Sequence, residues 1–212
     1  MKYLATSDYL DIVSVMADVV VENESYFCEL DSKAGDGDFG TSLAKGFKAI
    51  KENWEDLNKE DIGSFMRSCG MIIAESCGGV SGPIWGAAFT QAGRYAKGKN
   101  KINIVELSEL YQSMVDGIQK TGGAEIGDKT LLDALIPAVE SLKRSALRNE
   151  DIISSMRKFV EEAVNGAEST KGIVARKGRA SYVGERSLGF PDPGAMAVAI
   201  IHKEILNRIF LR

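Results

Sequence analysis

Apolar residues recur at three- and four-residue spacing along almost the whole chain, and the alternating pattern of a β-strand is nearly absent. This spacing lines apolar side chains along one face of a helix. Eight such stripes occur, over residues 12–20, 43–50, 65–76, 85–92, 107–114, 132–142, 152–164 and 198–209. The pattern predicts an all-α bundle of eight amphipathic helices with short connections. A chain of 212 residues that is 44% hydrophobic can bury one substantial core, so we expect residues 1–212 to form one domain.

An acidic, glycine-rich loop lies between the first two stripes. It brings Asp31, Asp36 and Asp38 within a few residues of one another. Carboxylates this close repel one another unless a cation lies among them, and Mg²⁺ prefers a few carboxylates with water and phosphate oxygens. The same residues also suit a surface turn that binds nothing. An EF-hand is excluded, because the twelfth position counted from Asp36 is Phe47 rather than an acidic residue.

Glycines gather at residues 35–40, 78–86, 122–127 and 184–194, each cluster just before a helical pattern. Helix N-termini preceded by flexible backbone bind anions through their N–H groups. Tight bundles also need small residues at helix ends, but four such loops together favour phosphate binding. The final cluster ends in Asp192-Pro193, which predicts an N-cap and a first helical residue, and Ser81-Gly82-Pro83 is interpreted in the same way.

The third glycine cluster, Gly122 to Thr130, nearly imitates a phosphate-binding P-loop. Asp128 stands where the lysine of that motif should follow the second framing glycine, and no strand pattern precedes it. We therefore reject a P-loop and expect a glycine-rich turn into a helix that starts near Leu131.

A basic run, Arg176-Lys177-Gly178-Arg179, gathers three cations in four residues. A solvated basic surface is the common role of such a run. An arginine that pairs with phosphoryl oxygens is the alternative, and Arg179 is the best placed for it, between small residues.

Composition excludes several classes of function. The net charge of −4 argues against a nucleic-acid partner. Three cysteines without a disulfide framework, no signal-peptide pattern and no apolar run of membrane-spanning length predict a soluble, cytoplasmic protein. The single histidine, His202, is expected on the flank of the last helix and is a poor candidate for catalysis.

The motifs together resemble one family. They are Gly35-Asp36-Gly37-Asp38, Gly78-Gly79-Val80-Ser81-Gly82-Pro83, Gly127-Asp128-Lys129-Thr130, Arg176-Lys177-Gly178-Arg179-Ala180-Ser181-Tyr182, Gly184-Glu185-Arg186-Ser187 and Asp192-Pro193-Gly194. In this order and over nearly the whole chain, they resemble the nucleotide-binding L subunit of dihydroxyacetone kinase. The resemblance implies an antiparallel eight-helix barrel with ADP and two Mg²⁺ ions at one end.

The resemblance also implies roles for individual residues. Asp31, Asp36 and Asp38 would ligate the two metals, and Arg179 would reach the nucleotide as the catalytic cation. The remaining nucleotide contacts would come from Phe39, Gly40, Thr41, Ser42, Val80, Ser81, Gly122, Leu131, Asp192, Pro193 and Gly194.

In the bacterial form of this family, ADP stays bound as a cofactor. A phosphohistidine on an M-type subunit of the phosphotransferase system converts it to ATP, and the phosphoryl group passes to dihydroxyacetone on a separate K-type subunit. The absence of a usable histidine in this chain fits that division of labour.

Three positions depart from the family pattern. Phe39 and Phe190 stand where the family commonly has histidine, and Ser42 stands near a common asparagine. Phenylalanine cannot donate a hydrogen bond or carry charge. A subfamily that uses free ATP or acts on a related ketose is therefore one alternative. A nucleotide-binding regulatory module without kinase activity is another.

Overall fold

The computed structural model describes residues 1–211 and confirms the all-α prediction. Each predicted stripe falls in one long helix, and the last continues into a π-helical turn, η4 (Leu206–Phe210). The long helices are α1 (Thr6–Glu22), α3 (Phe39–Glu52), α4 (Ile62–Ser76), α5 (Ser81–Tyr95), α6 (Ile104–Gly122), α7 (Leu132–Leu147), α8 (Ile152–Ser169) and α9 (Pro193–Ile205).

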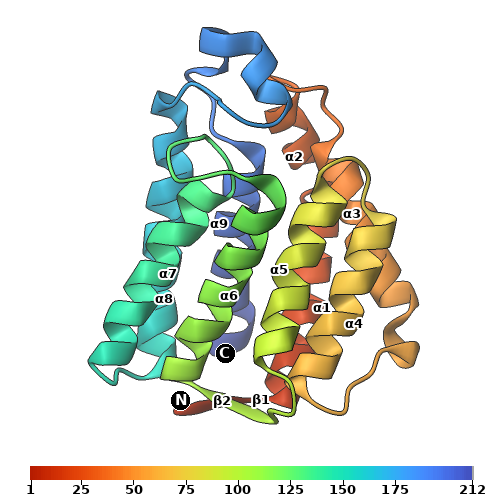
Figure 1. The fold of residues 1–212 in the computed structure, drawn as a ribbon, viewed down its shortest axis with the longest axis vertical. Helices are drawn as coiled ribbons and strands as arrows, with labels where there is room; N and C mark the ends of the chain where they lie inside the picture. Colours follow the sequence, from red (N-terminus) through yellow and green to blue (C-terminus); the bar gives the residue numbers. More distant parts are fainter. Residues whose placement is uncertain (212) are drawn as a thin grey trace.

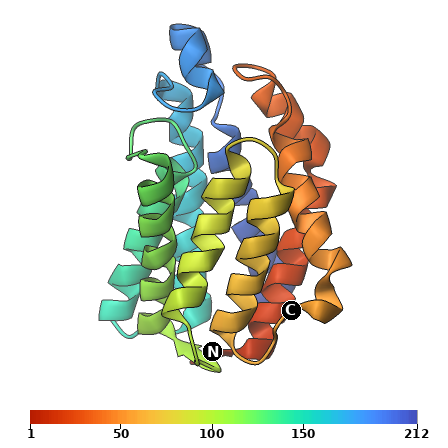
Figure 2. The same ribbon diagram turned by 45° about the vertical axis from the view of Figure 1, so that its right-hand side comes forward.

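These long helices form a closed ring. Each one packs against the next along the chain, and α9 packs against α1. Neighbours in the ring run in opposite directions, so α3, α5, α7 and α9 all begin at the same end (Figures 1 and 2). The structure is therefore the antiparallel eight-helix barrel that the family resemblance implied.

A short helix, α2 (Glu24–Asp31), was not predicted. Phe27 is its one buried side chain, so it shows too little apolar periodicity for a stripe. At the opposite end of the barrel, β1 (Tyr3–Ala5) and β2 (Lys101–Asn103) form a small antiparallel sheet with Leu4 opposite Ile102 (Figure 1). Three short 3₁₀ segments, η1 (Trp54–Asp56), η2 (Thr170–Gly172) and η3 (Arg179–Ser187), lie in connections.

Capping residues set several helix starts. Asp192 caps α9 by accepting a hydrogen bond from the Ala195 N–H at 2.8 Å, and Pro193 is the first helical residue, as predicted. The analogous prediction for Ser81 is wrong, because Ser81 is itself the first residue of α5 and Val80 precedes it without a side-chain cap. Pro137 lies within α7, which continues through it.

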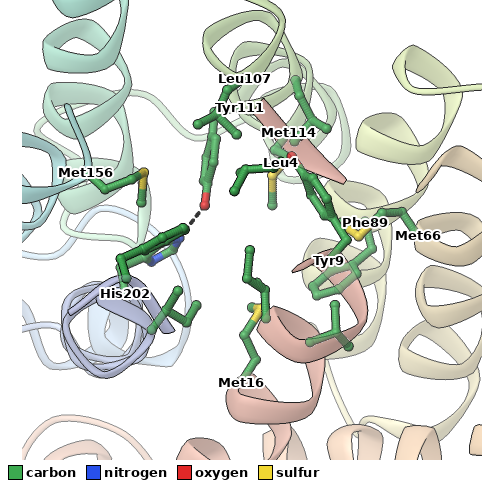
Figure 3. Close-up of a pocket in the computed structure, with 15 residues that line it drawn as sticks. Leu4, Tyr9, Met16, Met66, Phe89, Leu107, Tyr111, Met114, Met156 and His202 are labelled. Atoms are coloured by element: carbon green, nitrogen blue, oxygen red, sulfur yellow. Dashed lines mark hydrogen bonds between the residues drawn. The ribbon is translucent and has the colours of Figure 1, made fainter. Parts of the chain in front are cut away.

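Aliphatic and aromatic side chains fill the barrel interior and line a small apolar cavity of about 30 Å³ (Figure 3). His202 lies in its wall rather than on the helix flank that the sequence predicted, and is only 5% exposed. Its Nδ1 is 2.8 Å from the Val198 carbonyl oxygen and its Nε2 is 3.0 Å from the Tyr111 hydroxyl. The only histidine of the chain is thus a hydrogen-bonded core residue.

Within residues 1–211, no helix combines the length and apolar character that crossing a bilayer requires.

Candidate functional site at the loop end of the barrel

The carboxylate of Asp31, the last residue of α2, organises the acidic loop. Its Oδ2 accepts backbone N–H groups of Gly37 at 2.9 Å, Asp38 at 3.1 Å and Phe39 at 3.3 Å. A Cβ on Gly35 would overlap the same carboxylate, and Gly37 adopts a φ of 78°. The two glycines therefore allow the loop to fold back around Asp31.

This fold brings together the three carboxylates that the sequence singled out. Asp31, Asp36 and Asp38 each offer one oxygen, and these oxygens lie within 4.8 Å of one another. In the part of the chain that the structure describes, no other group of three acidic, histidine or cysteine side chains does this. Burial raises the pKa of Asp31, although the N–H groups that it accepts oppose the shift. An all-oxygen donor set at this spacing fits a hard divalent cation such as Mg²⁺.

Arg179 lies directly against this cluster. Its Nη1 is 2.5 Å from Asp36 Oδ2, and its Nη2 is 3.9 Å from Asp38 Oδ2. It is carried by a segment that we call the strap, residues 173–190, which crosses the loop end of the barrel (the blue segment at the top of Figures 1 and 2). Distant parts of the sequence thus place one cation of the basic run beside three carboxylates.

The start of α3 is tied to the loop between α4 and α5. The Ser42 hydroxyl donates a hydrogen bond to the Gly78 carbonyl at 2.8 Å, and Ser42 is buried. The Thr41 N–H contacts Cys28 Sγ on α2 at 3.3 Å. The Ser42 side chain and the Thr41 backbone N–H therefore both join the start of α3 to neighbouring elements.

Gly40 allows α2 and α3 to approach closely. A Cβ there would overlap the Glu24 carbonyl oxygen and lie 2.8 Å from the Cys28 backbone nitrogen. Because backbone cannot yield as a flexible side chain does, we expect Gly40→Ala to destabilise the fold by about 2 kcal/mol. Urea unfolding measures this. Gly172→Ala is the control, since nothing lies within 4 Å of a Cβ there, and equal stability of the two variants would contradict the prediction.

The second glycine loop begins α5. Gly79 has a φ of 57°, and Val80 is 72% exposed while Ser81 is buried. Backbone N–H groups at the start of α5 therefore face the same end of the barrel as the acidic loop.

The third glycine cluster leads into α7, which begins at Leu132 as predicted, but Gly122 does not lie at a helix start. Gly122 is the last residue of α6, and Gly123 ends the helix with a φ of 59°. A Cβ on Gly122 would lie 2.8 Å from Ile84 Cδ1 of α5. Gly122 therefore belongs to a helix C-terminus, whose dipole does not attract anions, and it serves close packing of α6 on α5.

Leu131 and the start of α9 lie together. A Cβ on Gly194 would lie 3.3 Å from Leu131 Cβ, and Asp192 also accepts the Ala195 N–H as the cap of α9. Burial raises the pKa of Asp192 to about 7. These residues form a second group, supplied by α7 and α9.

The two phenylalanines that depart from the family pattern have different surroundings. The Phe39 ring packs on Phe27 with centroids 6.0 Å apart. Phe190, at the end of the strap, is 39% exposed.

The sequence reasoning missed the role of Lys129, which it considered as a displaced P-loop lysine and as part of the Gly127-to-Thr130 motif of the family resemblance. It is 3% exposed, and its ammonium contacts four backbone carbonyls of segments that follow α8. The signal in the sequence was a single lysine in a polar, glycine-rich turn. Its partners could not be identified, because they are backbone carbonyls, which leave no pattern in the sequence.

The site residues thus come from four connections that gather at one end of the barrel. These are the loop after α2, the α4–α5 loop, the α6–α7 loop and the segment from α8 to α9 (Figures 1 and 2).

Comparisons with known proteins agree with this arrangement. The DAK2 domain family matches residues 33–207. The chain is 34% identical over 195 residues to the ADP-binding subunit DhaL of PEP-dependent dihydroxyacetone kinase from Escherichia coli, covering 92% of this chain and 93% of the relative. It is 32% identical over 197 residues to L-erythrulose 1-kinase of Mycolicibacterium smegmatis, covering 92% of this chain and 34% of that protein.

A solved structure shows the same fold. The dihydroxyacetone kinase from C. freundii in complex with AMP-PNP and Mg²⁺ superposes with a TM-score of 0.72 at 26% identity, over 98% of this chain and 35% of that one. Together, the matched domain, the identity to dihydroxyacetone kinase subunits and the shared barrel show that this chain belongs to the DAK2 domain family.

Proposed function

We propose that this chain is the phosphotransferase subunit of a dihydroxyacetone kinase. It holds ADP, or ATP when phosphorylated, with two Mg²⁺ ions. It passes the phosphoryl group from an M-type phosphohistidine protein of the phosphotransferase system to dihydroxyacetone on a separate K-type subunit. The observation that carries the proposal is the Arg179 guanidinium 2.5 Å from Asp36, within a cluster of three carboxylates. Relatives that are named kinase subunits support the activity.

Each group of site residues has its own role in this proposal. Asp31, Asp36 and Asp38 hold the metal ions, which neutralise phosphate charge when bound. The phosphates would be held at the positive N-terminal ends of α3 and α5, by residues Phe39 to Ser42 and by Val80 and Ser81. Leu131, Asp192 to Gly194 and Gly122 would line the nucleotide.

The exposure of the site suits transfer between proteins. The side chains of Arg179 and Asp38 are 61% and 64% exposed, and that of Asp36 is 36% exposed. A partner subunit can therefore bring a phosphohistidine or a bound sugar to the phosphates. Arg179 presents a planar fork of N–H donors to the phosphoryl oxygens, on which negative charge redistributes during transfer.

We also propose a cytoplasmic location and action as one domain over residues 1–212. The three cysteines support the location, because Cys28, Cys69 and Cys77 are all free.

Mass spectrometry of the purified protein, native and then denatured, tests the proposal. We expect ADP at one per chain, with Mg²⁺, and release of the nucleotide when the metal is chelated. ADP retained through purification supports the cofactor role and a phosphotransferase-system donor. An empty chain that binds ATP transiently instead supports direct use of ATP. A chain that binds nucleotide but transfers nothing to a K-type partner supports the regulatory module.

A related ketose is the second candidate acceptor, because Phe39 and Phe190 replace polar residues and one relative is an L-erythrulose 1-kinase. If these phenylalanines set specificity, Phe39→His and Phe190→His should change turnover with dihydroxyacetone relative to erythrulose. Steady-state kinetics with both ketoses measure the ratio. Unchanged turnover and unchanged affinity for ADP with Mg²⁺ in both variants would remove the reason for this candidate.

A further inference from the structure

The ammonium of Lys129 is enclosed by backbone carbonyls. Lys129 lies in the turn between α6 and α7 with a φ of 63°, and its side chain points inward with 3% exposure. The turn is fixed by Asp133, whose carboxylate accepts the N–H groups of Gly127 at 2.5 Å and Thr130 at 2.7 Å. The positive φ of Lys129 and the hydrogen bonds of its turn to Asp133 thus direct the ammonium away from solvent.

Four carbonyl oxygens receive this cation. Lys129 Nζ is 2.8 Å from Thr170 O, 3.2 Å from Ile173 O, 2.7 Å from Ser187 O and 2.7 Å from Phe190 O. An ammonium has three N–H donors, so these contacts use all of its hydrogen-bonding capacity. Every acceptor belongs to the strap or to the helix end just before it.

These carbonyls bracket the strap at both ends. Between them, Ala175 and Ser187 are the buried strap residues, and all those from Lys177 to Arg186 are exposed or only partly buried. Apolar packing therefore contributes little to the position of this segment. Two hydrogen bonds help Lys129 to hold the ends of the strap. They run from the Ala175 N–H to Ser187 Oγ at 3.0 Å and from the Arg176 N–H to the Asp128 carbonyl oxygen at 3.0 Å.

Arg179 sits in the exposed part of the strap, and its contact with Asp36 depends on where the strap lies. We propose that Lys129 is a positioning residue: its ammonium gathers the two ends of the strap and thereby holds Arg179 over the carboxylate cluster. This inference rests on the proposed function, in which Arg179 meets the phosphates.

A double-mutant cycle tests the inference on chains first freed of bound nucleotide by metal chelation. AMP-PNP with added Mg²⁺ is then the probe and calorimetry the readout. We expect Arg179→Ala to raise Kd about tenfold through loss of charged hydrogen bonds, and Lys129→Met to raise it nearly as much. If Lys129 acts through Arg179, the double variant should bind within about twofold of Arg179→Ala alone. A purely structural role predicts losses that multiply.

Trypsin supplies an independent readout, because Arg176, Lys177, Arg179 and Arg186 all lie in the strap. Lys129→Met should speed cleavage there about tenfold at temperatures where circular dichroism shows the barrel folded. Lys143→Met is the matched control, since Lys143 is on the same turn-and-helix unit but forms only an exposed pair with Glu140. If Lys129→Met does not fold, Lys129→Gln, which keeps two donors, enters the same cycle.

The outcomes separate the two proposals. A wild-type chain that does not bind AMP-PNP with Mg²⁺ refutes the proposed function. A wild-type chain that binds it, with multiplicative losses or unaltered strap cleavage in the Lys129 variants, overturns the positioning role and leaves the proposed function standing.

Discussion

An Arg179→Ala variant is expected to transfer phosphoryl groups on the order of 10³-fold more slowly than the wild-type chain, which is the scale of effect for an arginine that stabilises phosphoryl transfer. The physical reason is the fork of donors that Arg179 holds beside Asp36 and Asp38. Charge develops on the transferring group, so removing this cation should lower turnover far more than it weakens nucleotide binding. Formation of dihydroxyacetone phosphate with K-type and M-type partners measures the rate.

Two further variants sharpen this experiment. Arg179→Lys should restore little of the rate, because a lysine ammonium cannot offer the planar fork. Arg186→Ala is the matched control, since Arg186 lies in the same strap but forms no ion pair within residues 1–211. Wild-type turnover by Arg179→Ala would contradict the catalytic role of this residue.

The second large effect concerns pH and His202. Burial lowers the pKa of His202 to about 4, and the Val198 carbonyl opposes the shift only in part. An unfolded histidine titrates near 6.5, so between these values the unfolded chain binds more protons than the folded one. The contribution of neutral His202 is therefore complete above pH 6.5 and is lost as the pH falls, by about 3 kcal/mol at pH 4.

Urea unfolding of the wild type and of His202→Gln from pH 7 to pH 4 isolates this contribution. Glutamine retains hydrogen-bonding groups toward Val198 and Tyr111 but does not titrate. The stability advantage of the wild type should shrink as the pH falls. Asp192, whose pKa is raised by burial to about 7, changes stability in the opposite direction over this range, but it is present in both proteins. A stability difference that does not vary with pH would contradict the prediction, because it would show that His202 has the same pKa in the folded and unfolded chains.

His202 also shows where sequence reasoning reaches its limit. Helical periodicity located every long helix, because the spacing of apolar residues within a helix determines which of its faces is apolar. Which neighbour that face meets is not local information, so a histidine beside an apolar stripe could not be assigned to the interior. α2 was missed for the opposite reason, since it buries only Phe27 and gains its stability from packing on α3.

The residues of the candidate site also differ in how far the sequence could predict their contacts. Asp31, Asp36 and Asp38 are close in sequence, and glycines between them made their convergence predictable. The pairing of Arg179 with Asp36 spans most of the chain and was not predicted. The basic run singled out Arg179 and the family resemblance implied that it reaches the nucleotide, but neither identified Asp36 as its partner. Lys129 stands in a motif that carries the family resemblance, but its role could not be predicted, because its partners are carbonyl oxygens that any residue would supply.

The alternating direction of the barrel helices has a consequence for how ligands arrive. At the loop end, the starts of α3, α5, α7 and α9 are interleaved with the ends of α1, α4, α6 and α8. The positive and negative ends of the dipoles therefore largely cancel at a distance, and the chain carries a net charge of −4. An anionic nucleotide meets no long-range attractive field, so its association rate should be ordinary and depend little on ionic strength. Tight binding of such a ligand would then have to come from a low dissociation rate.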